Sequence, residues 1–234
     1  MCSSDLVADA KMKMYNLDGS EGKMCGNGIR CVGKFLYDHG MVDINEKDEI
    51  TIETLSGIKK LKAYTSGGKV NRLRVDMGKA ILEPKEIPVV LDGDKVVDRP
   101  VEIAGKNYNI TCVSMGNPHC VVFMDDIDNL DIETVGPEFE NDKLFPERVN
   151  TEFVTVLDDH TIKMRVWERG SGETWACGTG ACAVAVAACE NGFCKKGEDI
   201  KIKLKGGDLI INYTDETVYM TGNAEKVFEG EVEV

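Results

Sequence analysis

The feature that most constrains this chain is a short pattern, Cys-Gly-x-Gly, that occurs twice. The first copy begins at Cys25 and the second at Cys177, so 152 residues separate them (177 − 25). Each copy follows a stretch of small and acidic residues and precedes an apolar segment with helical spacing. A repeat this long indicates a duplicated domain, with a cysteine in each copy where a glycine turn opens a helix.

This position has a chemical consequence for both cysteines. A side chain at the start of a helix faces backbone N–H groups without helical partners and the positive end of the helix dipole. Such surroundings stabilise a thiolate and lower the thiol pKa from about 8.5 to roughly 3.5–7.5. Two thiols of this kind can remove a proton from one face of a carbon and replace it on the other. The same N–H groups can bind a carboxylate.

Composition and charge exclude several other classes of protein. A net charge of −13 and a pI near 4.8 argue against a nucleic-acid or anionic-membrane partner. The longest uncharged apolar stretch, Thr174 to Cys189, is shorter than the roughly 20 residues of a membrane span. No basic region followed by an apolar run opens the chain, and the nine cysteines are an odd number, which together favour a reducing cytoplasm.

Rival interpretations of the thiols are weaker. There is no Cys-x-x-Cys and there are only three histidines, so we expect no zinc site. The phosphate-loop pattern Gly-x4-Gly-Lys-Ser/Thr is missing. A hydrolytic cysteine would need a partnered histidine, and only His119 is a candidate.

Helical spacing and glycine caps predict helices over Gly28–His39 and Gly178–Asn191, and a short one over Asn129–Pro137. Alternating apolar residues between glycine-containing turns predict the strands. We expect these over 49–55, 58–65, 70–77, 109–113, 120–124, 151–157, 161–167, 200–204, 208–213 and 218–222, with a further one over 226–232. Residues 83–100 are expected to form an irregular surface excursion.

Four segments resemble one known family in order and spacing. MYNLDGSEGKMCGNGIRC (14–31) and WERGSGETWACGTGACA (167–183) are similar to the two signatures of the diaminopimelate epimerases. GNPH (116–119) and RVNTEFV (148–154) fit the same family. The resemblance extends along essentially the whole chain and favours this family over the proline racemases and the phenazine-type isomerases.

The resemblance implies an isomerase that interconverts LL- and meso-diaminopimelate in lysine and peptidoglycan precursor biosynthesis, without pyridoxal phosphate, any other cofactor or a metal. Cys25 and Cys177 would be the two bases, one a thiolate and the other a thiol. His119 and Glu168 would adjust their protonation. The substrate contacts implied are Asn16, Gly26, Asn27, Asn117, Asn150, Glu168, Arg169, Gly178 and Thr179.

The resemblance also implies an α+β fold of two pseudo-symmetric domains, each a curved mixed sheet around one central helix, with the site between them. We assign 1–77 plus 223–234 to the first domain and 78–222 to the second. A cytoplasmic homodimer that binds a small-molecule substrate is expected. The family carries roughly forty residues more at the start, which predicts an incomplete first domain.

Two alternatives remain open. The chain could be a related racemase or epimerase of another amino acid, such as proline or hydroxyproline. It could also be an inactive fragment that still binds a carboxylate, because an incomplete first domain predicts weak or absent turnover.

Overall fold

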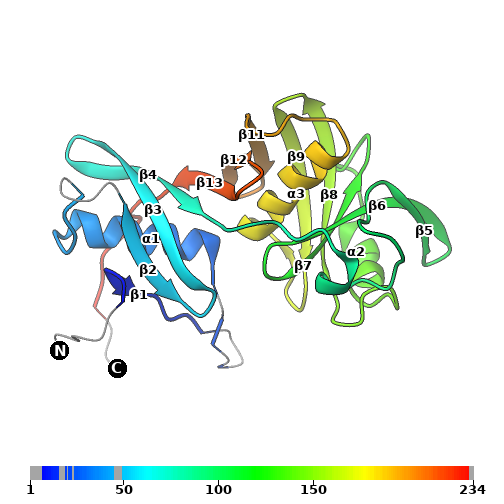
Figure 1. Cartoon of the computed structure of the whole chain (residues 1–234), viewed down its shortest axis with the longest axis horizontal. Helices are drawn as coiled ribbons and strands as arrows, with labels where there is room; N and C mark the ends of the chain where they lie inside the picture. Colours follow the sequence, from blue (N-terminus) through cyan, green and yellow to red (C-terminus); the bar gives the residue numbers. More distant parts are fainter. Residues whose placement is uncertain (1–6, 16–18, 20, 23, 45–48, 232–234) are drawn as a thin grey trace. The chain divides into compact units, whose positions relative to one another are not determined.

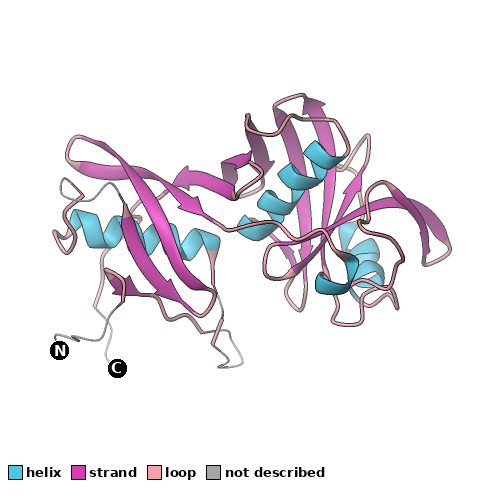
Figure 2. Cartoon of the chain, in the orientation of Figure 1, coloured by secondary structure: helices cyan, strands magenta, loops and turns pink. Residues whose placement is uncertain are grey.

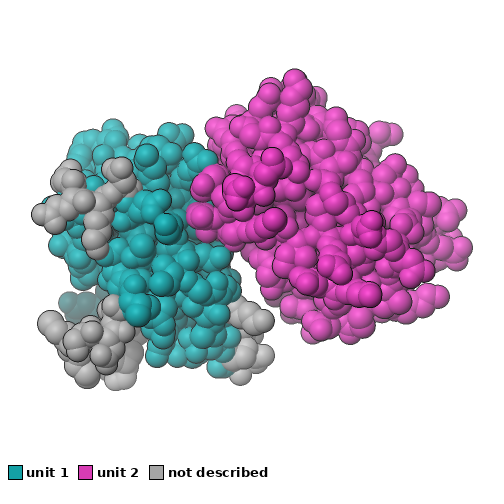
Figure 3. Space-filling view, viewed as in Figure 1, with its two compact units in different colours: residues 1–75, 221–234 teal, residues 76–220 magenta. Residues whose placement is uncertain are grey.

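The computed structural model of the chain describes residues 7–15, 19, 21–22, 24–44 and 49–231. These residues form two compact units (Figure 3). Unit 1 contains residues 1–75 and 221–234, and unit 2 contains residues 76–220. Within the described ranges, none of the helices is long and apolar enough to cross a membrane.

Unit 1 is one helix packed on a small sheet (Figure 1). The helix is α1 (Gly26–Asp38), and the sheet runs in the order β1 (Ala10–Lys11), β2 (Ile50–Thr54), β3 (Gly57–Ser66) and β4 (Lys69–Asp76). β1 is parallel to β2, and the other pairs are antiparallel.

Glycine allows α1 to lie close to this sheet. A Cβ atom on Gly33 would lie 2.7 Å from Leu73 Cδ2 and 2.9 Å from Leu61 Cδ2, closer than such carbons can approach. The helix buries only one face, which includes Ile29 and Leu36. Phe35 on another face is 51% exposed.

Unit 2 holds a larger mixed sheet. Its strands are β5 (Arg99–Ile103), β6 (Lys106–Ser114), β7 (Pro118–Phe123), β8 (Asn150–Asp158), β9 (Thr161–Glu168), β10 (Gly172–Thr174), β11 (Asp199–Leu204), β12 (Gly207–Tyr213) and β13 (Val218–Asn223), whose last three residues belong to unit 1. From β5 to β12 the spatial order is β5-β6-β7-β8-β9-β11-β12, and β10 pairs with β9. The β7–β8 and β9–β11 pairs are parallel. Parallel neighbours bring residues far apart in sequence to one end of the sheet.

The sheet of unit 2 surrounds its central helix, α3 (Gly178–Glu190) (Figure 2). The helix contacts β6, β7, β8, β11 and β12. Ten of its residues are buried, among them the whole run from Gly180 to Ala188. A helix that is apolar on every side fits such an enclosed position.

A second core of unit 2 lies around α2 (Ile132–Glu140). Gly136 sits directly against Trp167, since a Cβ atom there would lie 2.3 Å from Trp167 Cδ2. The Trp167 indole donates to Glu140 Oε2 at 2.7 Å. The Phe139 and Phe153 rings meet edge to face in the same core.

The structure confirms the expected α+β class and both main helices within one or two residues. The short helix is displaced to Ile132–Glu140. Residues 83–100 are not a simple surface excursion, because Ile87, Val89 and Val96 belong to the second core and the segment includes a short 3-10 helix, Pro84–Glu86.

Among the described residues, 226–231 form no strand, contrary to expectation. Their side chains are exposed, with Val227 at 88% and Phe228 at 82%. Their sequence alternates, but they pair with no strand in the described part of the chain.

Candidate active site

Cys25 caps the N-terminus of α1 in unit 1. Its backbone is extended (φ −128°, ψ 117°), and the Gly28 N–H donates to its sulfur at 3.3 Å. Because Gly28 lacks a Cβ atom, the sulfur can lie over the first turn of the helix: an added Cβ would be 3.5 Å from Cys25 Sγ. The side chain is half-buried.

Cys177 occupies the equivalent place in unit 2. It caps α3 with nearly the same backbone (φ −123°, ψ 111°), and the Gly180 N–H donates to its sulfur at 3.3 Å. Local sequence explains the match, since both cysteines precede Gly-x-Gly at the start of a helix. The cysteine is buried, 6% exposed.

The next two residues in each copy form the first turn of the helix. Gly26 and Gly178 are buried, and Asn27 and Thr179 follow them. The Asn27 Oδ1 atom is buried and has no hydrogen-bond partner among the described residues. Thr179 Oγ1 lies 3.5 Å from Cys177 Sγ. These turns therefore offer backbone donors beside each sulfur, as expected for a carboxylate site.

A chain of polar side chains leads from Cys177 into the core of unit 2. Asn117 Nδ2 donates to Thr179 Oγ1 at 3.3 Å, and Asn117 Oδ1 lies 3.1 Å from His119 Nε2. His119 Nδ1 lies 2.7 Å from Glu152 Oε1. His119 and Glu152 are both fully buried. His119 lies within strand β7.

Glu168 at the end of β9 is the other titratable neighbour of Cys177. It accepts a hydrogen bond from the Thr174 hydroxyl. Burial raises the pKa of Glu168 above its ordinary value, and the Glu152 carboxylate adds to the rise. Hydrogen bonds from Thr174 and Cys177 oppose the rise without cancelling it.

The expectation of a lowered thiol pKa is wrong for Cys177. Burial raises the pKa of this thiol well above its ordinary value, and the nearby Glu168 and Glu152 carboxylates raise it further. The Thr179 hydroxyl and the Gly180 N–H stabilise the thiolate, but less strongly. Removal from water therefore outweighs the helix N-terminus, and Cys177 is a thiol at neutral pH.

Asn150 and Arg169 lie together at the same end of the unit 2 sheet. Asn150 Nδ2 donates to the Pro118 carbonyl at 2.9 Å, and the Arg169 N–H donates to Asn150 Oδ1 at 3.0 Å. The Arg169 guanidinium donates to the Glu147 carbonyl at 2.8 Å. The Asn150 side chain therefore links the start of β8 to Pro118 of β7 and to Arg169, which follows β9.

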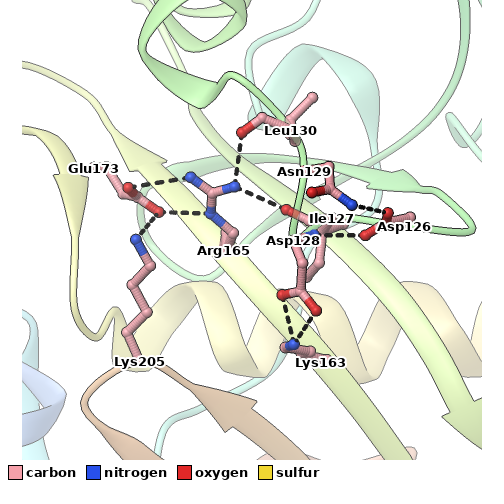
Figure 4. A network of polar contacts seen from close by, with 9 residues as sticks. All are labelled: Asp126, Ile127, Asp128, Asn129, Leu130, Lys163, Arg165, Glu173 and Lys205. Carbon is pink, nitrogen blue, oxygen red and sulfur yellow. Dashed lines mark hydrogen bonds and ion pairs between the residues drawn. The ribbon is translucent and has the colours of Figure 1, made fainter.

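Ion pairs hold the short strand β10 that leads into Cys177 (Figure 4). Arg165 Nε donates to Glu173 Oε1 at 2.8 Å, and Lys205 Nζ lies 2.8 Å from the same oxygen. Arg165 also donates to the Ile127 and Leu130 carbonyls at 2.8 and 2.7 Å. Although burial opposes ionisation, Arg165 and Lys205 hold the pKa of Glu173 below its ordinary value.

The outcomes for the expected residues differ. Asn117, Asn150, Glu168, Arg169 and Thr179 of unit 2 lie near Cys177 or are linked to its neighbours. Asn16 lies outside the described residues. Sequence reasoning missed Glu152, although it is the only charged residue between Val149 and Leu157. No group of three or more metal-ligating side chains occurs in the part of the chain that the structure describes.

Comparisons with known proteins agree with this geometry. The family model "Diaminopimelate epimerase" matches residues 4–83 and 111–227. A diaminopimelate epimerase of Agathobacter rectalis is 52% identical over 236 residues, covering 97% of this chain and 81% of the relative. One of Acetivibrio thermocellus is 53% identical over 229 residues, covering 97% of this chain and 80% of the relative.

Solved structures share the fold at low sequence identity. A hydroxyproline epimerase of Agrobacterium vitis has a TM-score of 0.70 and 16% identity, covering 95% of this chain and 70% of that one. A PhzF-family phenazine biosynthesis protein of Bacillus anthracis has a TM-score of 0.67 and 18% identity, covering 99% and 83%. With the sequence matches over nearly its whole length, the chain belongs to the diaminopimelate epimerase family.

Proposed function

We propose that this chain epimerises LL-2,6-diaminopimelate to meso-diaminopimelate by a two-base mechanism. The observation that carries the proposal is the matched pair of N-cap cysteines, each with a helix N–H 3.3 Å from its sulfur. The family relationship supplies the substrate. Lysine and peptidoglycan precursors are the products that such a step serves.

In the forward reaction one thiolate removes the α-proton, and the electron pair of the broken C–H bond is delocalised into the α-carboxylate. The other cysteine then donates its thiol proton to the opposite face of the carbon. The first turns of the two helices, at Gly26 and Asn27 and at Gly178 and Thr179, supply N–H donors for the negative charge. One such donor is worth roughly 2.7–4 kcal/mol to a transition state.

The raised pKa of Cys177 indicates which role it takes in the free protein. A group that is protonated at neutral pH can donate, so Cys177 is the acid when Cys25 is the base. After turnover the proton is on Cys25, and the pair is ready for the reverse reaction. Each cycle therefore inverts the protonation of the pair.

The second carboxylate and the amino group of diaminopimelate need partners of opposite charge. We assign the distal carboxylate to Arg169, whose guanidinium has five N–H donors in a planar arrangement that suits a carboxylate. Asn16, Asn117 and Asn150 are further contacts, and Glu168 pairs with the substrate ammonium. Glu168 and His119 also adjust the protonation of the thiols.

We also propose a cytoplasmic homodimer that needs no pyridoxal phosphate. The odd number of cysteines supports a reducing compartment. Two cysteines that serve as acid and base leave no step that requires a carbonyl cofactor. Sedimentation of the purified chain would test the dimer.

Deuterium exchange tests the chemistry directly. In deuterated water without pyridoxal phosphate, the chain should incorporate deuterium at the α-carbon of diaminopimelate. Cys25→Ala and Cys177→Ala should each abolish conversion of LL to meso isomer, whereas Cys31→Ala, an exposed cysteine on the same helix as Cys25, should retain it. Conversion that survives the loss of either capping cysteine would refute the two-base scheme.

One observation favours the alternative of a carboxylate-binding chain with little turnover. The helix that begins at Cys25 is exposed along one side at Cys31 and Phe35, so less packing supports it than supports the buried helix that begins at Cys177. Calorimetric binding of diaminopimelate with no deuterium incorporation would support this alternative. A panel with proline and hydroxyproline tests the remaining one, since Arg169 and Asn150 should require a distal carboxylate.

A further inference from the structure

We propose that Glu152 is a positioning residue that controls the protonation of Cys177 through His119, Asn117 and Thr179. This inference rests on the proposed function, because it assigns a role within the same thiol chemistry. All five residues belong to unit 2. Glu152 itself touches neither sulfur nor substrate in this scheme.

The side chains form an unbroken line of polar contacts. Glu152 Oε1 lies 2.7 Å from His119 Nδ1, and His119 Nε2 lies 3.1 Å from Asn117 Oδ1. Asn117 Nδ2 donates to Thr179 Oγ1 at 3.3 Å, and Thr179 Oγ1 lies 3.5 Å from Cys177 Sγ. Each polar group of Asn117 and His119 is used by its neighbours in this line.

Donor and acceptor roles follow from one end of the line to the other. An amide oxygen only accepts, so His119 Nε2 must carry a proton when it faces Asn117 Oδ1. A second proton then lies between His119 Nδ1 and Glu152 Oε1, whichever atom holds it. The His119–Glu152 pair is therefore neutral overall. Thr179, which accepts from Asn117 Nδ2, is free to donate its hydroxyl proton to a Cys177 thiolate.

Loss of one proton from the His119–Glu152 pair reverses the direction of the hydrogen bonds between His119 and Cys177. A neutral His119 that donates from Nδ1 to ionised Glu152 has an acceptor at Nε2, which requires the Asn117 amide to rotate by 180°. Asn117 Oδ1 then accepts from the Thr179 hydroxyl, and Thr179 accepts from a Cys177 thiol. Thus a protonated pair favours the thiolate, and a deprotonated pair favours the thiol.

The surroundings hold Glu152 in place. A Cβ atom on Gly180 would lie 2.5 Å from Glu152 Oε1, so the glycine of the second motif makes room for this carboxylate. Glu152 Oε2 is buried and has no hydrogen-bond partner among the described residues. A carboxylate with one free oxygen in the core depends on its single bond to His119, which ties its charge to the state of the imidazole.

Other titratable groups face this line and belong in any analysis of its pH dependence. Glu168 of β9 raises the pKa of Cys177, and its charge also interacts with Glu152 and His119. Cys120 follows His119 on β7, where burial and the neighbouring Cys112 and Glu152 keep its pKa well raised. Cys120 is therefore a neutral thiol, whereas Glu168 is a carboxylate that competes with Glu152 in setting the protonation of Cys177.

The test uses two readouts that need no turnover, so its failure is distinct from failure of the proposed function. Nitrogen-15 spectra of the imidazoles report the protonation of His119, which is one of only three histidines. Alkylation of Cys177 by iodoacetamide, followed by peptide mass spectrometry across pH, reports its thiolate fraction. In Glu152→Gln we expect the Nε2 atom of His119 to change from a protonated to an unprotonated signal and Cys177 to be alkylated about tenfold more slowly, which equals one unit in thiol pKa.

Two further variants separate the line of hydrogen bonds from simpler effects. Thr179→Val should slow Cys177 alkylation without changing the His119 spectrum, and adding Glu152→Gln should then slow it no further. Glu140→Gln, at a buried carboxylate that bonds Trp167, is the matched control and should change neither readout. Faster alkylation in Glu152→Gln, also in the Thr179→Val background, would mean that Glu152 acts only by its charge through space. That result, or an unchanged His119 spectrum, would overturn the proposal.

Discussion

Helices α1 and α3 begin in the same way but are surrounded differently. Both are capped by a cysteine with extended backbone and a 3.3 Å bond from the third helical residue. The two motifs are 152 residues apart, so Ala183 and Ala187 of α3 correspond to Cys31 and Phe35 of α1. The two alanines are fully buried, whereas Cys31 and Phe35 are exposed. The start of a helix is thus a local feature, whereas its enclosure depends on strands from elsewhere in the chain.

The two helices also differ in the strands that they contact. α3 contacts β6, β7 and β8, which end at residues 114, 123 and 158. In the described part of unit 1, α1 packs on strands that follow it, β2 and β3.

Substitutions at one matched pair of positions should give the largest difference in helix stability between the two units. Ala187→Phe forces a ring into a closed core and should destabilise α3 by about 3 kcal/mol. Phe35→Ala removes a half-exposed ring and should cost α1 less than about 1 kcal/mol. Hydrogen exchange of peptides from each helix measures both. Similar losses at the two positions would show that α1 is as enclosed as α3.

A second matched pair tests whether α1 can move. Ala185→Gly in α3 loses a buried methyl group and helix propensity, about 2 kcal/mol in all. Gly33→Ala in α1 brings a carbon within 2.7 Å of Leu73, but an exposed helix can shift away. We expect a net loss of about 1 kcal/mol, since the gain in helix propensity offsets part of the strain. A loss above that of Ala185→Gly, measured by the same exchange experiment, would mean that α1 is fixed.

The smallest expected effect concerns the stability of unit 2 at low pH. Because the pKa of Glu173 is lowered in the folded protein, its stabilisation is complete above the unfolded pKa of about 4.3 and is lost as pH falls through the folded value. Glu173→Gln should remove about 1 kcal/mol at pH 7 and weaken the acid response of unit 2.

Unit 1 provides the control for this experiment. Burial opposes ionisation of Asp38, but hydrogen bonds from Lys34 and the Val70 N–H lower its pKa, so unit 1 has an acid response of its own. That response should persist in Glu173→Gln, as measured by hydrogen exchange between pH 7 and pH 3. A change of equal size in both units would contradict a local role for Glu173.

Sequence alone predicts what depends on neighbouring residues. The two helices and their caps follow from Cys-Gly-x-Gly and an apolar run, and both are observed. The contact of Glu152 with His119 was not predicted, because it needs β7 and β8 to be parallel neighbours with His119 opposite Asn150. The core role of Ile87 and Val96 was missed because their segment has no regular periodicity.

The chemistry of Cys177 shows the same division between local and distant causes. A helix start predicts a stabilised thiolate, and the Gly180 N–H does bond the sulfur. The two carboxylates lie on the separate strands β8 and β9, and together with burial they raise the pKa of the thiol instead of lowering it. Burial of a site is the property that a single sequence conveys least.

The positions of the tryptophans give the molecule an intrinsic fluorescent label in unit 2 only. Both, Trp167 and Trp175, belong to unit 2, so emission excited at their absorption edge comes from that unit alone. Trp167 is held against Gly136 and bonded to Glu140, whereas Trp175 is 75% exposed and two residues from Cys177. A blue-shifted and a red-shifted component should therefore be separable, and a quencher in solution should select the red one. A ligand that reaches Cys177 would be seen in the emission of Trp175 without any added dye.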